Sequence, residues 1–356
     1  MNHYDSALPR CQVFSPDVSF EGLENYRGRA LCLTDNGDII QLPNTIKHCW
    51  SWISNHYERI GLIHTKNVIW DSAFERIRDF PWHDISVFIF TKEIHAVRPD
   101  ERRLLAVNKA NSKNRFIKMC QELGVSVPET ACFDSIEDFR DPGLSFPLYF
   151  KGDVSVSGLA VTRCENQDDL IQVMKHLKPG DGFQLQKELH AHSFINLQYE
   201  VTDGVLKRTT ATEQILDGTS HNGNVFPSGF EAWNVVDPVA ESLCADGIKD
   251  IFAFDVAMTD NGPVALECNP RFNGSTYPTV IADKLSIPSW LATNIKLHTD
   301  SFEGLSLDGL EYNPNTKSGI IVYNWGCVLN QKLGVLVAGD CREEQEHILL
   351  AAQKAL

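Results

Sequence analysis

The sequence contains no apolar run that approaches the ~18–20 residues of a membrane-spanning helix, so no membrane protein is predicted. Its first residues lack the basic and then apolar order of a secretory signal peptide. Basic residues are scarce, since 32 Lys and Arg face 47 Asp and Glu, and the formal net charge is −15. This charge disfavours binding to nucleic acid and to anionic lipid. We therefore expect small molecules as partners, and neither nucleic acid nor a membrane.

No two of the ten cysteines have Cys-x-x-Cys spacing, so a thiolate zinc site is not predicted. Scattered cysteines in a long chain without a signal peptide are typical of reduced, mostly buried thiols in the cytoplasm. Internal repeats and low-complexity tracts are absent as well. The 356 residues are 43% apolar and 22% charged, which is ordinary globular usage. At roughly 150 residues per domain, this length predicts two or three domains.

The first hundred residues alternate between helix and strand signals. Ile46 and Tyr57 belong to a helically spaced apolar set that follows Asn44, a favourable helix cap. The apolar run 85–90 predicts a buried strand. Such alternation predicts a small α/β domain with a parallel sheet over residues 1–105. Because Gly-x-Gly-x-x-Gly is absent, we assign no dinucleotide to this domain.

Near residue 100, basic residues cluster in this otherwise acidic chain. A charge run of this kind is usually a solvated helix face, and composition alone favours that interpretation. The alternative is that part of the run faces a polyphosphate. The run comprises Arg98, Arg102, Arg103, Lys109, Lys113, Arg115 and Lys118.

The middle of the chain has the pattern of antiparallel strands with an inserted helix. Asn166 caps this helix, with Asp169 three residues later as in a capping box. The breaker-rich segment 217–229 predicts a long loop of the kind that often covers a binding site. The expected strands are 146–151, 158–162, 182–189, 194–201, 205–214, 251–258 and 264–269, and the C-terminal segment adds strands 320–323 and 334–337 and a helix over 343–356.

The strongest chemical signal surrounds a predicted hairpin turn at Asp260-Asn261-Gly262. Glu267 and Asn269 are two residues apart on the return strand, so they share one face. If the turn is a three-residue loop, Asp255 pairs with Glu267 across the hairpin and joins that face. If it is a two-residue loop, Asp255 and Glu267 lie on opposite faces.

Two carboxylates and an amide oxygen that converge in this way would repel one another without a cation. Mg²⁺ is usually held by one or two carboxylates together with substrate phosphates, so Asp255, Glu267 and Asn269 are candidate metal ligands. The alternative is a set of unrelated polar positions on a half-exposed sheet. Arg271 follows directly and carries a forked cation suited to a carboxylate or a phosphate, although it could instead form a surface salt bridge.

The order of these residues resembles the ATP-grasp superfamily of carboxylate–amine ligases, in particular its amino-acid and peptide ligase branch. The resemblance runs from about residue 108 to residue 282, roughly half of the chain. It implies an ATP-grasp fold, α/β and α+β, with an N-terminal Rossmann-like (pre-ATP-grasp) domain and the nucleotide between two α+β subdomains. The segments that carry it are Asn108-Lys109, Phe116-Ile117, 123–128, 147–151, 155–158, 186–189, 254–256 and 266–271.

The resemblance also implies a role for each segment. Two lysines would donate to the α- and β-phosphates, a small-residue loop would close over the phosphates, and a hinge would hold adenine through its backbone. The implied nucleotide-binding residues are Lys109, Lys151, Ser155, Ser157, Gly158, Gln186, Lys187, Glu188 and Leu189; the implied metal ligands are Asp255, Glu267 and Asn269, and Arg271 orients the substrate carboxylate or stabilises an oxyanion. The implied domains are 1–105, subdomain A over 106–182, subdomain B over 183–300 and a C-terminal extension over 301–356 packed on the core.

The sequence departs from the family pattern in two places. Gly-x-Glu often follows the hinge, but here the stretch is His190-Ala191-His192-Ser193, so Glu188 is the remaining acid for the ribose. Some relatives carry an arginine two residues before the metal aspartate, where this chain has Ala253. Lys207 or Arg208 on a neighbouring strand could supply the missing cation, or each could be an edge-strand charge.

The function implied by the resemblance is ATP-dependent formation of an amide or peptide bond between a small carboxylate, such as an amino acid, and an amine. ATP and one or two Mg²⁺ ions, with Mn²⁺ as a substitute, are the expected cofactors. Two alternatives remain: another ATP-grasp chemistry such as carboxylation with bicarbonate, and a nucleotide-binding regulator without turnover. Related ligases are often dimers, so a homodimer is a further expectation.

Overall fold

The computed structural model describes residues 9–15, 21–143, 145–154 and 161–356. These residues form two compact units. Unit 1 comprises the chain up to residue 100 together with 223–227 and 272–356, and unit 2 comprises 101–222 and 228–271. Residues up to 100 of the predicted segment 1–105 and the whole of segment 301–356 therefore contribute to the same unit, whereas 101–105 belong to unit 2.

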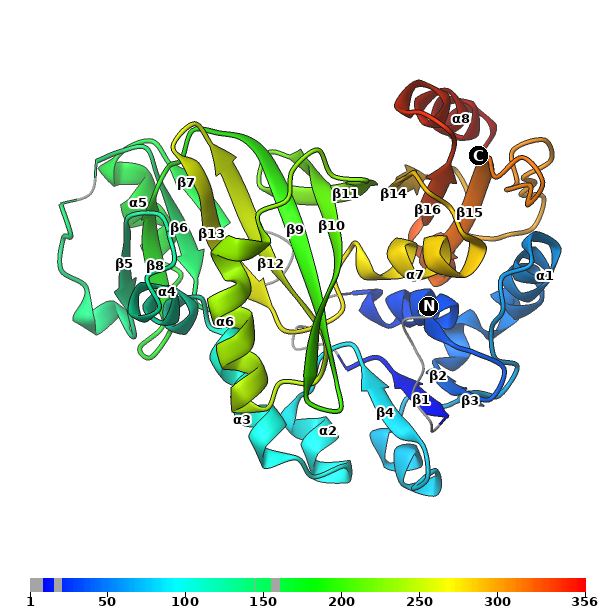
Figure 1. Ribbon diagram of the computed structural model, residues 1–356, viewed down its shortest axis with the longest axis horizontal. Helices are drawn as coiled ribbons and strands as arrows, with labels where there is room; N and C mark the ends of the chain where they lie inside the picture. The colour runs from blue at the N-terminus through cyan, green and yellow to red at the C-terminus, as the bar shows by residue number, and fades with distance from the viewer. Residues whose placement is uncertain (1–8, 16–20, 144, 155–160) are drawn as a thin grey trace. The chain divides into compact units, whose positions relative to one another are not determined.

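Unit 1 contains the expected parallel sheet. Its order is β3-β2-β1-β4, and every neighbouring pair is parallel. The apolar run after Asn44 is helical as predicted, but it begins as a 3-10 turn before the α-helix, and it buries Ile46 and Tyr57. The strands are β1 (Arg10–Val13), β2 (Ile39–Leu42), β3 (Val68–Trp70) and β4 (Asp84–Val87), and the helices are η1 (Leu23–Leu33), η2 (Asn44–Cys49), α1 (Trp50–Ile60), η3 (Phe74–Asp79) and α2 (Lys92–Val97) (Figure 1).

The C-terminal part of unit 1 is an antiparallel array in which β14 pairs with β11 and β16, and β16 pairs with β15. This confirms the two predicted strands and the terminal helix. The long loop predicted over 217–229 is wrong, because 220–226 is a strand. Its glycine permits close backbone approach, since a Cβ at Gly223 would lie 2.1 Å from the carbonyl oxygen of Ala292. The elements are β11 (Ser220–Phe226), α7 (Thr276–Leu285), β14 (Trp290–Lys296), β15 (Gly319–Asn324), η5 (Trp325–Asn330), β16 (Lys332–Ala338) and α8 (Arg342–Ala355).

Unit 2 contains a small four-stranded sheet of order β5-β8-β6-β7, whose pairs are all antiparallel. Helix α5 (Gln167–Met174) begins as predicted, with the Asn166 side chain accepting hydrogen bonds from the backbone N–H of Asp168 and Asp169. The strands are β5 (Thr130–Phe133), β6 (Leu148–Gly152), β7 (Val161–Cys164) and β8 (Phe183–Lys187), and η4 (Ile136–Asp138) follows β5.

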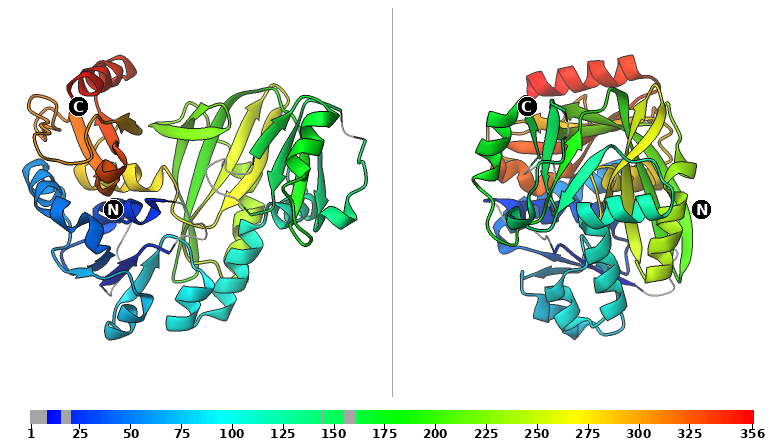
Figure 2. Two further views of the ribbon diagram at one scale, coloured as in Figure 1. Left: turned by 180° about the vertical axis from the view of Figure 1, so that it is seen from behind. Right: turned by 90° about the vertical axis from the view of Figure 1, so that its left-hand side faces the viewer.

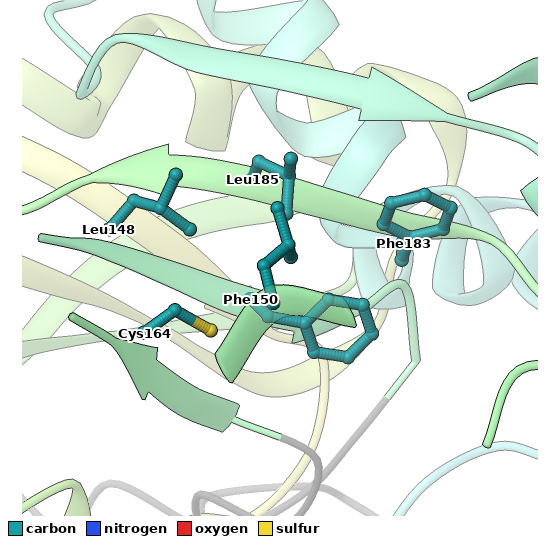
Figure 3. Packing of buried hydrophobic residues seen from close by; sticks show 6 residues of the cluster. Leu148, Phe150, Cys164, Phe183 and Leu185 are labelled. Atoms are coloured by element: carbon teal, nitrogen blue, oxygen red, sulfur yellow. The ribbon is translucent and has the colours of Figure 1, made fainter. Parts of the chain in front are cut away.

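The core of this small sheet follows from strand alternation. Leu148 and Phe150 on β6 and Phe183 and Leu185 on β8 pack together on one face (Figure 3). Leu170 of α5 belongs to the same buried cluster. Alternation places Lys151 on the opposite face of β6. The apolar face thus fixes the direction in which the predicted phosphate lysine points.

Unit 2 also contains strands β13-β12-β9-β10, all antiparallel to their neighbours. Helix α6 covers one face of them with four apolar side chains: Val236, Val239, Ala240 and Leu243 (Figure 1). The opposite face of β9 carries the polar residues Asn196, Gln198 and Glu200. The elements, which Figure 2 shows from behind and from the side, are α3 (Glu101–Asn111), α4 (Lys113–Glu122), β9 (Ala191–Thr202), β10 (Val205–Asp217), α6 (Trp233–Asp246), β12 (Asp250–Thr259) and β13 (Gly262–Asn269).

Two predictions from composition can be compared with the structure. All ten cysteines are described, and all are free thiols, eight of them buried or partly buried. Among the described residues, no helix combines the length and the hydropathy needed to cross a bilayer.

Candidate active site

The β12–β13 hairpin brings Asp255 opposite Glu267, as expected, but by a different route. The turn has two residues, because Thr259 pairs with Gly262, so of the two alternatives left open by the sequence it is the two-residue loop that forms. A β-bulge between Asp255 and Val256 inserts one extra residue into β13 and reverses the parity of the pairing. The bulge therefore restores the common face that a two-residue turn alone would have abolished.

Three side-chain amides surround the carboxylate of Asp255. Asn196 and Gln214 each donate to its Oδ1 at 2.7 Å, and Asn269 donates to its Oδ2 at 3.0 Å. Asn196 stands opposite Asp255 in the register of β9 and β12, so strand alternation places both on one face. The carboxyl groups of Asp255 and Glu267 also share a hydrogen bond.

The two acids have opposite electrostatic surroundings. Burial raises the pKa of Asp255 well above its usual range, and the charge of Glu267 adds to that rise. Burial also disfavours ionisation of Glu267, but the ammonium groups of Lys113 and Lys151 outweigh it and lower the pKa of Glu267 below its usual range. Of the two acids, Asp255 is therefore the one on which protonation is favoured.

Lys113 supplies the nearest cation, with its Nζ 2.9 Å from Glu267 Oε2 and its side chain only 6% exposed. It lies at the first position of α4, after Ser112 breaks the helix with an extended backbone. Asp153, just after β6, fixes this helix start, because its carboxylate accepts from Ser112 Oγ and from the backbone N–H of Asn114. The α3–α4 junction thus aims a buried ammonium group at the acid pair.

Lys151 lies near the same cluster and donates to Gln186 Oε1 at 2.6 Å. Burial lowers the pKa of Lys151 to about 8; the charges of Glu267 and Asp255 raise it and that of Lys113 lowers it. Gln186 is itself fixed by a 3.2 Å hydrogen bond from its Nε2 to Thr130 Oγ1. The structure therefore brings together Lys151, Gln186 and the acid pair, all of which the sequence selected.

Three other predicted cations lie elsewhere in unit 2. Lys109 forms a 2.7 Å ion pair with Asp246, with both side chains 39% exposed. Arg208 pairs with Asp237 of α6, on the sheet face opposite Asp255. Lys207 faces the same side of the sheet as Asp255, but it is exposed and pairs with Glu200 of β9. Glu200 lies four residues, or about 13 Å, along β9 from Asn196, which is the residue opposite Asp255. The structure thus does not place any of these three against the acid pair; Lys113 and Lys151 occupy that position.

The remaining nucleotide-binding candidates are described only in part. Glu188 accepts two hydrogen bonds from the Arg163 guanidinium, at 2.5 and 3.0 Å, and this contact lowers its pKa. Lys187 at the end of β8 pairs with Glu129 at 3.2 Å, and Leu189 is half-buried just beyond the strand. Ser155, Ser157 and Gly158 lie outside the described residues.

Arg271 follows β13 directly and is buried, with 8% exposed. Its backbone N–H donates to the carbonyl of Asn269 at 2.8 Å, which turns the chain sharply after the last predicted metal ligand. Its charge acts on the site, because it lowers the pKa values of Glu267 and Cys268. It is therefore the third cation in the electrostatic surroundings of the acid pair.

The donor set fits a divalent cation bound by oxygen. Asp255 and Glu267 supply carboxylate oxygens, and Asn269 uses its Nδ2 to hold Asp255, while its Oδ1 accepts from no described residue. A cation beside the two acids would offset the cost of holding both carboxylates ionised, because the charge of Glu267 and burial both raise the pKa of Asp255. Among the described residues, no group of three or more His, Cys, Asp or Glu side chains gathers in a way that could hold a metal ion. Two carboxylates with an amide are enough for Mg²⁺ when phosphates complete the shell.

Sequence reasoning missed Lys113, Asn196 and Gln214 as site residues. Lys113 was visible within the basic run, but the helix break at Ser112 that separates it from Lys109 was not. Asn196 shares strand parity with the polar residues Gln198 and Glu200, which was a usable signal of a polar sheet face. Gln214 carried no signal, because its contact with Asp255 reaches from β10 to β12 across the intervening strand β9.

These two units and this site define a chain with the ATP-grasp fold, since solved structures of that fold match it along nearly its whole length. One is N5-carboxyaminoimidazole synthetase from Staphylococcus aureus in complex with ADP, with a TM-score of 0.64, 11% identity and 97% of each chain covered. Another is the L-amino acid ligase from Bacillus licheniformis, with a TM-score of 0.61, 12% identity, and 98% of this chain and 97% of that one covered. A third is N5-carboxyaminoimidazole synthase from Aspergillus clavatus with ADP and 5-aminoimidazole ribonucleotide, with a TM-score of 0.64, 13% identity and 98% of each chain covered.

No known sequence family and no curated protein matches the sequence. At 11–13% identity, the structural likeness defines the fold, which confirms the fold class predicted from the sequence.

Proposed function

We propose that this protein is an ATP-dependent ligase that joins a small carboxylate to an amine through an acyl-phosphate, releasing ADP and phosphate. The observation that carries the proposal is the cluster of Asp255, Glu267 and Asn269 with the buried Lys113 and the partly buried Lys151. Acids, an amide and lysines in this arrangement suit a metal-bound polyphosphate. A purely structural role would not explain why these charged groups are gathered in one place.

In the proposed reaction, a carboxylate oxygen of the substrate attacks the γ-phosphorus of ATP. The bond from that phosphorus to the bridging oxygen breaks, and ADP leaves. The amine nitrogen then attacks the acyl carbon, the carbon–oxygen bond to phosphate breaks, and the nitrogen loses its proton to solvent. Both steps depend on positioning and charge neutralisation more than on covalent chemistry by the protein.

The residues of the cluster have separate tasks in this proposal. Asp255, Glu267 and Asn269 hold magnesium, which neutralises charge on phosphate oxygens when it is bound. Lys113 and Lys151 donate to phosphate oxygens, and Lys113 replaces Lys109 as the first lysine because of its position beside Glu267. Arg271 binds the substrate carboxylate or the oxyanion that develops on it.

The names of the similar structures favour two versions of the carboxylate. One is an amino acid, as the name of the L-amino acid ligase indicates, and the other is bicarbonate, as the carboxyaminoimidazole synthetases suggest. The two versions differ in the product, since the first yields an amide or a peptide and the second a carboxylated amine.

The test is ADP and phosphate release by the full chain with Mg-ATP, first alone, then with a pool of amino acids, and then with bicarbonate and a pool of amines. Release that requires a carboxylate, together with a product whose mass equals acid plus amine minus water, supports the ligase. Release that requires bicarbonate supports carboxylation. Nucleotide binding without release under any condition would replace both with a regulator. Glu267→Gln serves as the inactive control.

A further inference from the structure

Arg29 of unit 1 is a cation for which the described residues supply no hydrogen-bond acceptor. It is half-buried on η1, and no hydrogen bond or ion pair joins its guanidinium to any residue that the structure describes. Its Nε is buried and unpartnered. A desolvated guanidinium without an oxygen acceptor is costly, so its presence calls for an explanation.

Aromatic rings hold this guanidinium in place. Its central carbon lies 4.6 Å from the ring centre of Tyr277, 5.0 Å from that of Phe88, and 5.5 Å from those of Phe14 and Tyr26. Such contacts stabilise a cation through the ring faces. They do not supply the in-plane oxygen acceptors that the N–H groups of a guanidinium favour.

The titratable groups around Arg29 supply no counter-charge either. Burial raises the pKa of Cys32 and Cys327 to about 12 each, and it also raises those of Tyr26 and Tyr323. Arg29 lowers all four of these values, which shows that it is their electrostatic neighbour, but all four groups remain neutral at physiological pH. The positive charge is therefore uncompensated within the described part of unit 1.

The location of Arg29 is that of a ligand site in parallel sheets. Phe14 and Phe88 directly follow β1 and β4, and the ladder continues there, since Phe88 N–H donates to the carbonyl of Val13 at 3.0 Å. In the order β3-β2-β1-β4, the chain leaves β1 on one side and returns to it on the other. Ligands of open parallel sheets bind outside the carboxyl ends of the strands at such a reversal.

We propose that Arg29 is the anion-binding residue of a ligand site at the carboxyl ends of β1 and β4, and that it holds a carboxylate or a phosphate of a small molecule. The aromatic rings orient the guanidinium and leave its N–H edge for two oxygens of the anion. This proposal stands on unit 1 alone and does not depend on the function proposed for unit 2.

Arg27 is a matched control two residues away. Its Nε and Nη1 are also buried without a partner, but it lies over a single ring, that of Phe74 on η3, at 6.0 Å. The proposal therefore predicts a difference between two arginines of the same helix that both lack acceptors.

The first experiment modifies the full wild-type chain with phenylglyoxal and maps the adducts by mass spectrometry, in chloride, in inorganic phosphate and in acetate at equal ionic strength. We expect phosphate or acetate to slow modification of Arg29 several-fold more than that of Arg27. Protection by phosphate alone assigns a phosphate group, and protection by acetate alone assigns a carboxylate. Equal effects on both arginines, or protection of neither, would overturn the proposal.

The second experiment titrates the same two anions against wild type, Arg29→Met, Arg29→Lys and Arg27→Met by calorimetry. We expect at least tenfold weaker binding in both Arg29 variants and unchanged binding in Arg27→Met, because lysine keeps the charge but loses the two-pronged donor geometry. Lys113→Met separates this site from the phosphate site proposed in unit 2, since it should remove only binding that belongs there. Wild-type affinity in a folded Arg29→Lys variant would refute the assignment.

Discussion

Replacing Asp255 with asparagine should stabilise the protein in the absence of divalent cations, although it removes a residue on which the proposed activity depends. Asparagine has the same shape and can keep an oxygen toward Asn196 and Gln214, which both donate to Oδ1. Its amide would take the place of Oδ2 and donate to Glu267, replacing the proton that the two acids now share. The substitution therefore removes a charge while retaining most of the hydrogen bonds.

The magnitude follows from the pKa of Asp255, which burial, aided by Glu267, raises from 3.8 to about 7. Each tenfold change in proton affinity is worth about 1.4 kcal/mol, so ionised Asp255 destabilises the folded state by up to about 4 kcal/mol above pH 7. The penalty is absent below pH 4 and develops between pH 4 and pH 7. Part of this penalty belongs to the interaction with Glu267, and the Asn269 side chain must reorient in the variant. We therefore expect Asp255→Asn to raise the free energy of unfolding by about 1–3 kcal/mol at pH 8.

Glu267→Gln is the matched comparison, and it should have the opposite sign. Lys113 and Lys151 together hold the pKa of Glu267 below its usual range in spite of burial. Glu267 therefore stabilises the fold above about pH 4, and this contribution is lost as the pH falls further. Neutralising it removes the carboxylate that pairs with Lys113 and leaves Asp255 as the remaining acid of the pair beside the two ammonium groups, so we expect a loss of about 2–4 kcal/mol at neutral pH.

The assay is urea unfolding of both variants and wild type between pH 4 and pH 8.5, first with EDTA and then with about 10 mM MgCl₂ and ATP. Wild type should gain stability with Mg-ATP and both variants should gain little, because ligand binding to the folded state adds to its stability. If Asp255→Asn is less stable than wild type at pH 8 in EDTA, the raised pKa of Asp255 is wrong. If it keeps the wild-type response to Mg-ATP, Asp255 is not a metal ligand.

Two further predictions concern the lysines. Lys113→Met should weaken Mg-ATP binding at least tenfold in calorimetry, whereas Lys109→Met should change it less than twofold. The reason is that the exposed Lys109–Asp246 ion pair is worth about 0–1 kcal/mol and does not contact the acid pair. Equal effects of the two substitutions would restore Lys109 as the first phosphate lysine. Because burial lowers the pKa of Lys151 to about 8, its positive charge is present below pH 8 and is lost above it. Nucleotide affinity should therefore fall between pH 7 and pH 9 in wild type but stay constant in Lys151→Arg. A parallel fall in both proteins would attribute the pH dependence to another group.

The elements that could be predicted from the sequence are those with strong local signals. The cap at Asn166, the β12–β13 hairpin and the terminal strand–strand–helix segment all formed as expected, because their periodicity and turn residues suffice to specify them. The loop prediction for segment 217–229 was wrong because its local signal conflicts with its tertiary surroundings. Its glycines and asparagines indicate a loop, but Gly223 is there to let β11 approach β14, which is a tertiary requirement.

The candidate site was predictable in its acids and only partly in its cations. Asp255, Glu267 and Asn269 lie in one short hairpin, so strand alternation relates them directly. The lysines come from distant segments, and their direction depends on a helix break at Ser112 and on the apolar face of β6. Arg208 illustrates the limit, since only the β9–β10 register, with Arg208 opposite Tyr199, shows that it faces α6.

The acid pair also indicates why this hairpin carries a bulge. Without it, the two-residue turn would place Asp255 and Glu267 on opposite faces, and neither acid would be strained by the other. With it, the two carboxyl groups lie together beside Lys113, and burial together with the charge of Glu267 raises the pKa of Asp255, so ionising Asp255 costs stability. A residue that lowers stability in the empty protein and is favourable only once a cation arrives is characteristic of a binding site rather than of a core. Deleting Leu266, the extra residue of the bulged strand, would place Glu267 directly after Ala265 and still opposite Asp255. The acids should therefore remain on one face and the variant should keep Mg-ATP binding; loss of binding in a folded variant would show that the bulge itself is required.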